Sequence, residues 1–116
     1  MSSADRFEIL YENTVIGTTS FELGDPPMGV AFGKFTPTPA YRRDDITDNN
    51  QLSAWVAGRA IPAEGLGIEG TVESGEMEVT ILGIPYPLYA ELFPGHVEAY
   101  KALLSADRTD LAKSAL

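Results

Sequence analysis

The chain has 116 residues, enough for one domain with a hydrophobic core, and its formal net charge of −9 argues against the basic surface that nucleic-acid binding requires. It contains no cysteine, which excludes disulfides and thiol catalysis. No apolar stretch approaches the ~18 residues of a membrane span, and the N-terminus lacks the pattern of a signal peptide. We expect one globular domain over residues 1–116, soluble and cytoplasmic, with residues 106–116 prone to fray.

Two alternating runs near the N-terminus predict a β-hairpin. Apolar and polar residues alternate over residues 7–12 and again over 15–23, with Asn13-Thr14 as the turn. A third strand is expected over Val30–Thr36. It lies within the segment 24–41, which holds four of the eight prolines. Because proline fixes the backbone and glycine permits close approach, we expect this segment to be central to the fold.

Gly33 lies in the middle of the third strand, where it indicates a bulge or a close neighbour. A functional alternative is that it forms the floor of a ligand groove. Asp48 and Gln51 then form a helix capping box. Since Leu52, Trp55 and Val56 follow at helical spacing, we expect a helix over Asp48–Gly58 with Trp55 packed against the sheet.

A second hairpin is predicted over residues 68–81, with Ser74-Gly75 at its turn. Val72, Met77, Val79 and Ile81 should share one face, opposite the glutamates, whereas the glycine-rich residues 63–67 should form a loop. Pro87 is expected to begin a short helix, Pro94 a longer one, and Asp107 a last short one. The fold class is therefore α+β: a mainly antiparallel sheet of about five strands, two hairpins plus a central strand, covered by two or three helices.

The acidic residues are unevenly distributed. Between Ala60 and Tyr100 the chain has seven glutamates and neither lysine nor arginine. The alternation of the second hairpin places four of these glutamates on its outward face: Glu69, Glu73, Glu76 and Glu78. This row predicts a binding surface for a basic protein partner, although acidity that serves only solubility is the alternative.

No catalytic constellation or metal site is apparent. His96 is the only histidine and follows Pro94-Gly95, where a role at a helix terminus is favoured over catalysis. Paired glutamates can run acid–base chemistry or bind a hard cation, but a solvent-facing row is not desolvated, so neither is favoured. Arg42 and Arg43 can clamp an anion, yet Asp44 and Asp45 follow them directly, which favours a neutralised surface pair.

The sequence therefore favours a non-enzymatic protein-binding module, such as an inhibitor, an immunity-like protein or an adaptor, without cofactor or metal. The alternative is a small-molecule-binding domain or an enzyme, with a pocket between sheet and helices. Four residues would define that pocket: Gly33, Tyr41, Arg42 and Trp55.

Overall fold

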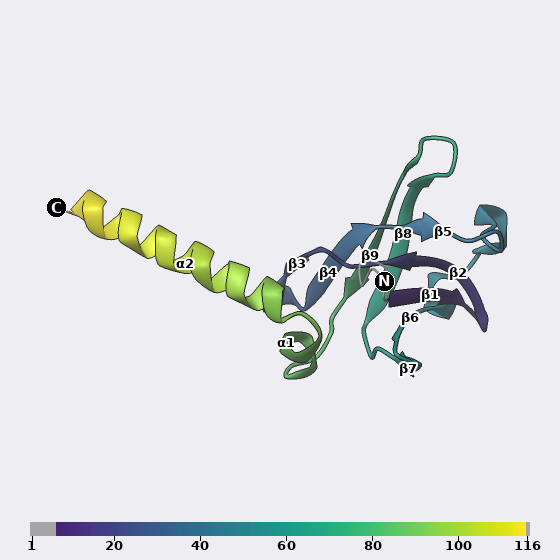
Figure 1. Ribbon diagram of the computed structural model, residues 1–116, viewed down its shortest axis with the longest axis horizontal. Helices are drawn as coiled ribbons and strands as arrows, with labels where there is room; N and C mark the ends of the chain where they lie inside the picture. Colours follow the sequence, from purple (N-terminus) through teal and green to yellow (C-terminus); the bar gives the residue numbers. More distant parts are fainter. Residues whose placement is uncertain (1–6, 116) are drawn as a thin grey trace.

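The computed structural model describes the backbone of residues 7–115 and the side chains of residues 7–104. Two antiparallel sheets form the body of the protein (Figure 1). The five-stranded sheet has the order β5-β2-β1-β6-β7, with β1 Phe7–Tyr11, β2 Thr14–Thr19, β5 Thr36–Pro37, β6 Leu52–Val56 and β7 Arg59–Ala60. The four-stranded sheet has the order β3-β4-β9-β8, with β3 Leu23–Asp25, β4 Val30–Lys34, β8 Gly65–Thr71 and β9 Glu76–Leu82.

Two α-helices follow the last strand, α1 Leu88–Leu92 and α2 Pro94–Ala115. Short 3-10 turns, η1 Pro26–Met28, η2 Arg43–Asp45 and η3 Asn49–Gln51, lie in the connections. The predicted α+β class with mainly antiparallel strands is therefore confirmed, with the strands divided between two sheets. The predicted separate helix at Asp107 is wrong, because α2 is continuous to Ala115. The expected fraying of residues 106–116, whose side chains lie outside the described residues, stays a prediction.

The core lies between the two sheets and is closed at one end by α1. Phe7 of β1 stacks on Phe93, which follows α1, and Phe21 meets both rings edge-on. Tyr89 of α1 is fully buried beside Phe93. Beyond this end, α2 extends away from both sheets (Figure 1), which gives the molecule a long dimension of 58 Å.

The segment 20–37 connects the sheets twice, which explains two differences from the sequence prediction. The second strand was expected to continue to residue 23, but it ends at Thr19 because Phe21 adopts a φ of 46° and turns the chain into the other sheet. The third strand, expected over residues 30–36, is divided at Phe35 into β4 and β5, one in each sheet. The central role of this segment therefore comes from its two crossings between sheets.

Gly33 has the close neighbour that the sequence indicated, and β4 keeps a continuous register with β9 through it. A Cβ atom at this position would collide with the carboxylate of Glu22 and lie 3.0 Å from the Glu22 backbone nitrogen. The glycine is therefore explained by packing against Glu22.

The predicted helix over residues 48–58 is wrong. Asp48 does cap a helical turn, accepting a hydrogen bond from the Asn50 amide, but only the 3-10 turn η3 follows. The chain then continues as β6, which pairs with β1 and β7. Leu52 and Ala54 point into the core, whereas Trp55 lies on the opposite face of the strand and is half-buried. Strand alternation, rather than a helical stripe, fixes these positions.

The predicted loop over residues 63–67 is also partly strand, because β8 begins at Gly65. Both glycines of this run, Gly65 and Gly67, pair with β9.

Candidate functional site

The hairpin of β8 and β9 carries its carboxylates on the solvent side. In β9, exposed Glu76 and Glu78 alternate with buried Met77 and Val79, so core packing fixes which side the glutamates take. Glu69 of β8 is the direct cross-strand partner of Glu78. We call Glu69, Glu76 and Glu78, together with the hollow that they line, the acidic face.

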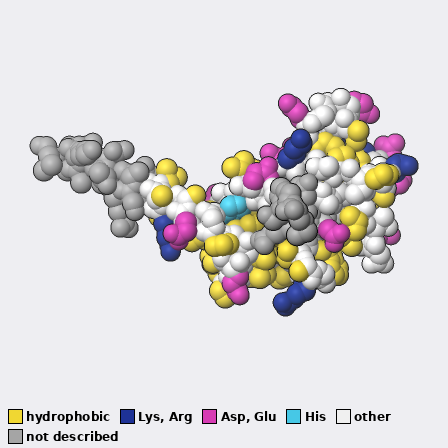
Figure 2. Space-filling view, viewed as in Figure 1, with side chains coloured by type: hydrophobic (Ala, Val, Ile, Leu, Met, Phe, Trp, Pro, Cys, Tyr) yellow, Lys and Arg dark blue, Asp and Glu magenta, His cyan; other side chains and the backbone are white. Residues whose placement is uncertain are grey.

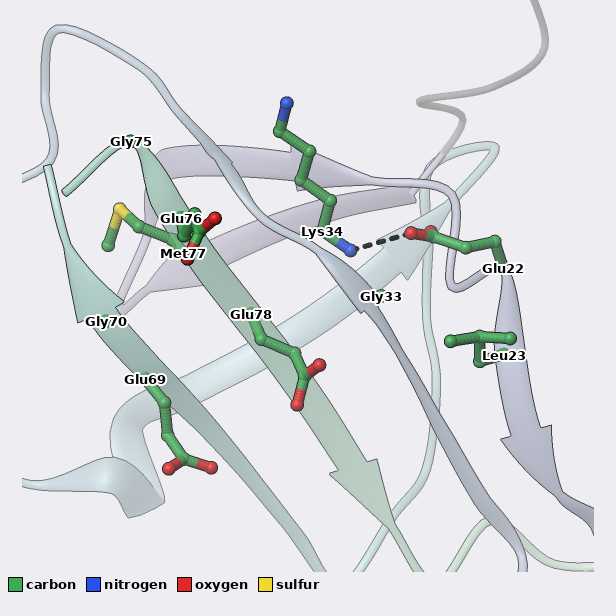
Figure 3. Close-up of a pocket in the computed structure, with 10 residues that line it drawn as sticks. All are labelled: Glu22, Leu23, Gly33, Lys34, Glu69, Gly70, Gly75, Glu76, Met77 and Glu78. Carbon is green, nitrogen blue, oxygen red and sulfur yellow. Dashed lines mark hydrogen bonds between the residues drawn. The ribbon is translucent and has the colours of Figure 1, made fainter.

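The hollow has a volume of about 630 Å³ and reaches from β8 across β9 and β4 to the start of β3 (Figure 3). Its lining consists of Glu22, Leu23, Gly33, Lys34, Glu69, Gly70, Gly75, Glu76, Met77 and Glu78. Four of these side chains are carboxylates and one is an ammonium, so the hollow favours a cationic ligand.

Lys34 does not neutralise the acidic face. It is the register partner of Glu78 across β4 and β9. Figure 3 nevertheless shows its side chain extending away from the Glu78 carboxylate, and the one ion pair within 4.0 Å among the described side chains joins Lys101 and Glu98 on α2. The carboxylates of Glu69 and Glu78 therefore have no counter-ion in the described part of the chain.

Glu22 is a member of this site that the sequence analysis missed. Its carboxylate accepts a 2.9 Å hydrogen bond from the Lys34 amide, drawn in Figure 3, and a 2.8 Å bond from the Ser20 hydroxyl. The Glu22 carboxylate therefore bonds the edge of β4 at Lys34, beyond Phe32, where the pairing of β4 with β3 ends. Although burial raises the pKa of Glu22, these hydrogen bonds outweigh it and hold the pKa below 4.5. No local pattern predicts this contact, because it joins a side chain to a backbone amide twelve residues along the chain and leaves the residue alternation unchanged.

Glu73, the fourth glutamate of the predicted row, lies elsewhere. It belongs to the turn 72–75, which interrupts the alternation, and it lines a separate hollow beside Arg43 and Asp45. The same turn leaves Val72 56% exposed rather than on the buried face where alternation placed it.

The structure does not bring the four residues of the predicted alternative pocket together, because only Tyr41 and Arg42 share a hollow, the one that Glu73 also lines. Gly33 lines the acidic hollow, whereas Tyr41 is buried edge-on against Phe35. Arg42 is exposed and its guanidinium donates to the carbonyls of Pro39 and Tyr41. The indole of Trp55 donates to the Ser53 hydroxyl on the outer face of the five-stranded sheet. No described hollow contains all four of these residues.

His96 lies where α2 meets the body, visible as the cyan side chain in Figure 2. Its ring stacks on Phe93, and its Nδ1 is 3.0 Å from the Tyr89 hydroxyl. That hydroxyl also donates a 2.7 Å hydrogen bond to the Val30 carbonyl. Burial lowers the pKa of His96, while hydrogen bonds to the backbone of Phe21 and Glu22 act in the opposite direction. These contacts anchor the start of α2.

Two further features bear on function. No group of three or more histidine, aspartate or glutamate side chains suited to a metal ion is found among the described residues. Neither described helix is both long and apolar enough to cross a membrane.

Comparisons of the chain with protein-family models, curated proteins and solved structures find no match. The candidate site is therefore defined by its own residues and geometry.

Proposed function

We propose that this protein is a non-enzymatic binding module that docks a basic partner protein on the acidic face. The observation that carries the proposal is the direct pairing of Glu69 with Glu78, both exposed and without a counter-ion in the described chain. Like charges opposite each other in a sheet are unfavourable by roughly 0.2–1 kcal/mol. A positively charged partner surface removes this repulsion on binding.

The surroundings of the pair support the same function. Glu76 and the Glu22 carboxylate border the same hollow. Figure 2 shows acidic side chains on both sides of the hairpin tip, which rises above the body. Together these charges would attract a basic protein and raise its rate of association. The absence of cysteine suits a module that acts in the reducing cytoplasm.

Capture from a lysate of the source organism tests this proposal when it is done with three forms of the protein. The site variant carries Glu69→Lys and Glu78→Lys. The control carries Glu8→Lys and Glu91→Lys, two exposed acids outside the acidic face, so both variants change the net charge equally. We expect the wild type and the control to retain a basic protein that the site variant loses. Equal retention by all three forms would contradict the proposal.

A second candidate function, binding of an apolar small molecule, is favoured by a hollow of about 760 Å³ between β3 and α2. Leu23, Phe32, Tyr100 and Leu103 contribute apolar atoms to its lining. A neutral apolar dye such as Nile red should then gain fluorescence with the wild type and with Leu82→Glu, an exposed position outside this hollow, but not with Leu103→Glu. Equal fluorescence with both variants would remove this candidate.

A further inference from the structure

The strand β8 is a long edge of a sheet. Among the described strands, the edges of the two sheets are β3, β5, β7 and β8. The first three have only two or three residues, whereas β8 has seven, with neither proline nor lysine among them. Proteins usually shorten or charge such an edge, because its free backbone groups can pair with another chain.

The direction of the free backbone groups follows from one hydrogen bond. The Phe35 amide donates to the Met77 carbonyl, so Met77, and with it every second residue of β9, directs its backbone groups toward β4. Glu76, Glu78 and Thr80 must then direct theirs toward β8, where their register partners are Thr71, Glu69 and Gly67. The intervening residues of β8 therefore present their amides and carbonyls at the free edge: Leu66, Ile68 and Gly70.

A donor already occupies this edge from outside the sheet. The guanidinium of Arg43 on η2 donates to the Gly70 carbonyl at 3.2 Å. Two hollows, of about 550 and 510 Å³, border β8 on either side of this contact, one beside η3 and β6 and the other beside η2. An extended segment that paired with this edge, where η3 also contacts β8, would replace the single Arg43 bond with a series of backbone bonds.

The stability of the isolated protein does not explain why position 67 of the edge strand is a glycine. A Cβ atom there would have nothing within 4 Å, and the backbone φ is not positive, so neither packing nor conformation requires glycine. Glycine also weakens a strand relative to residues with side chains. It leaves the outer side of β8 flat beside Glu69, so that long side chains of a neighbouring strand can lie across it.

We propose that an extended segment of the basic partner, with lysine or arginine at alternate positions, pairs with the free edge of β8 as an additional strand. This inference rests on the proposed function and specifies how the partner binds. The backbone bonds to Leu66, Ile68 and Gly70 would supply affinity, and the alternate cations would lie next to Glu69 on the outer side. Charge complementarity with the acidic face selects a basic segment over other extended chains.

The test uses a short peptide of alternating lysine and valine and the full chain labelled for amide hydrogen exchange. Peptide binding at low ionic strength should slow exchange of the Leu66, Ile68 and Gly70 amides by about tenfold or more, since they become hydrogen-bonded. The amides of Gly67, Glu69 and Thr71 are already bonded to β9 and should change little.

Two matched peptides, N-methylated on every lysine or on every valine, separate backbone pairing from charge. Residues of an added strand direct their amides alternately toward and away from β8. Edge pairing therefore predicts that one methylated peptide loses binding and that the other keeps it.

Three further outcomes are informative. Equal binding of both methylated peptides, with unchanged exchange at the edge amides, overturns edge pairing. If both methylated peptides bind the wild type equally but do not bind the Glu69→Lys/Glu78→Lys variant, docking on the acidic face stands without edge pairing. No binding of any peptide at low ionic strength overturns both proposals.

Discussion

Glu69 and Glu78 lie directly opposite each other on β8 and β9, exposed to solvent, with no lysine or arginine bonded to either in the described chain. Core packing of Met77 and Val79 on the other side of β9 holds Glu78 outward. The fold therefore maintains a like-charge pair at its surface, and this pair is the basis for the proposed docking of a basic partner.

Glu69→Gln should raise the free energy of unfolding by roughly 0.2–1 kcal/mol at low salt, because it removes the repulsion from Glu78. The gain should disappear at high salt, where surface charges are screened. Urea denaturation at both ionic strengths measures it, with Glu8→Gln as the control on another sheet. A loss of stability at low salt would show that Glu69 takes part in a favourable contact.

Glu22→Gln should flatten the pH dependence of stability in acid. The Lys34 amide and the Ser20 hydroxyl hold the pKa of Glu22 below 4.5, so the folded protein favours the ionised form. The stabilisation is complete above the unfolded-state pKa and is lost as pH falls through the lower folded-state pKa. Denaturant unfolding from pH 5 downward should show a smaller loss in the variant than in the wild type. Parallel profiles would contradict the role assigned to Glu22.

Gly24→Ala should destabilise the fold by about 1–3 kcal/mol through overpacking. The added Cβ would collide with the Tyr89 hydroxyl and with His96 Nδ1, which join α1 and α2 to the four-stranded sheet. Gly67→Ala is the matched control, since its Cβ would meet nothing within 4 Å, and it should be neutral or stabilising. Thermal denaturation of the two variants checks the contrast, and an equal response would contradict the packing at Gly24.

The pKa of His96 should lie below 6.5, because its burial beside Phe93 disfavours the imidazolium. The unfolded chain then binds more protons as pH drops below 6.5, so folding stability should fall over that range and stay level above it. An NMR titration of the single histidine measures the pKa. A value above 6.5 would mean that the backbone of Phe21 and Glu22 outweighs burial. His96→Gln should lower stability only modestly.

Sequence patterns identify strands in which apolar and polar residues alternate strictly. They do not identify the structure of a segment whose apolar spacing fits both a helix and a strand. Phe7 and Ile9 are buried in β1, and Met77, Val79 and Ile81 are buried in β9, so the faces of these strands were predicted correctly. Leu52 and Val56 satisfy both helical and strand spacing, and the pairing with β1 that makes this segment a strand is long-range. The Asp48 cap, correctly identified, supports only one 3-10 turn.

Residue alternation also predicted part of the candidate site. Alternation placed Glu69, Glu76 and Glu78 on the outward side, and the structure gathers them around one hollow. Glu73 was placed with them because alternation was extended into the turn 72–75, where it does not apply. Glu22 was missed because its carboxylate bonds the Lys34 backbone amide twelve residues along the chain, a contact that residue alternation does not specify.

The most direct test of the acidic face is the association rate of the captured basic partner as a function of ionic strength. Three forms are compared: the wild type, Glu69→Lys/Glu78→Lys and the control Glu8→Lys/Glu91→Lys. We expect the rates of the wild type and the control to fall steeply with salt, since steering charges are screened over a Debye length of about 10 Å at 0.1 M. The site variant should associate more slowly and show a flatter salt dependence. Identical rates and salt dependence in all three forms would contradict docking on the acidic face.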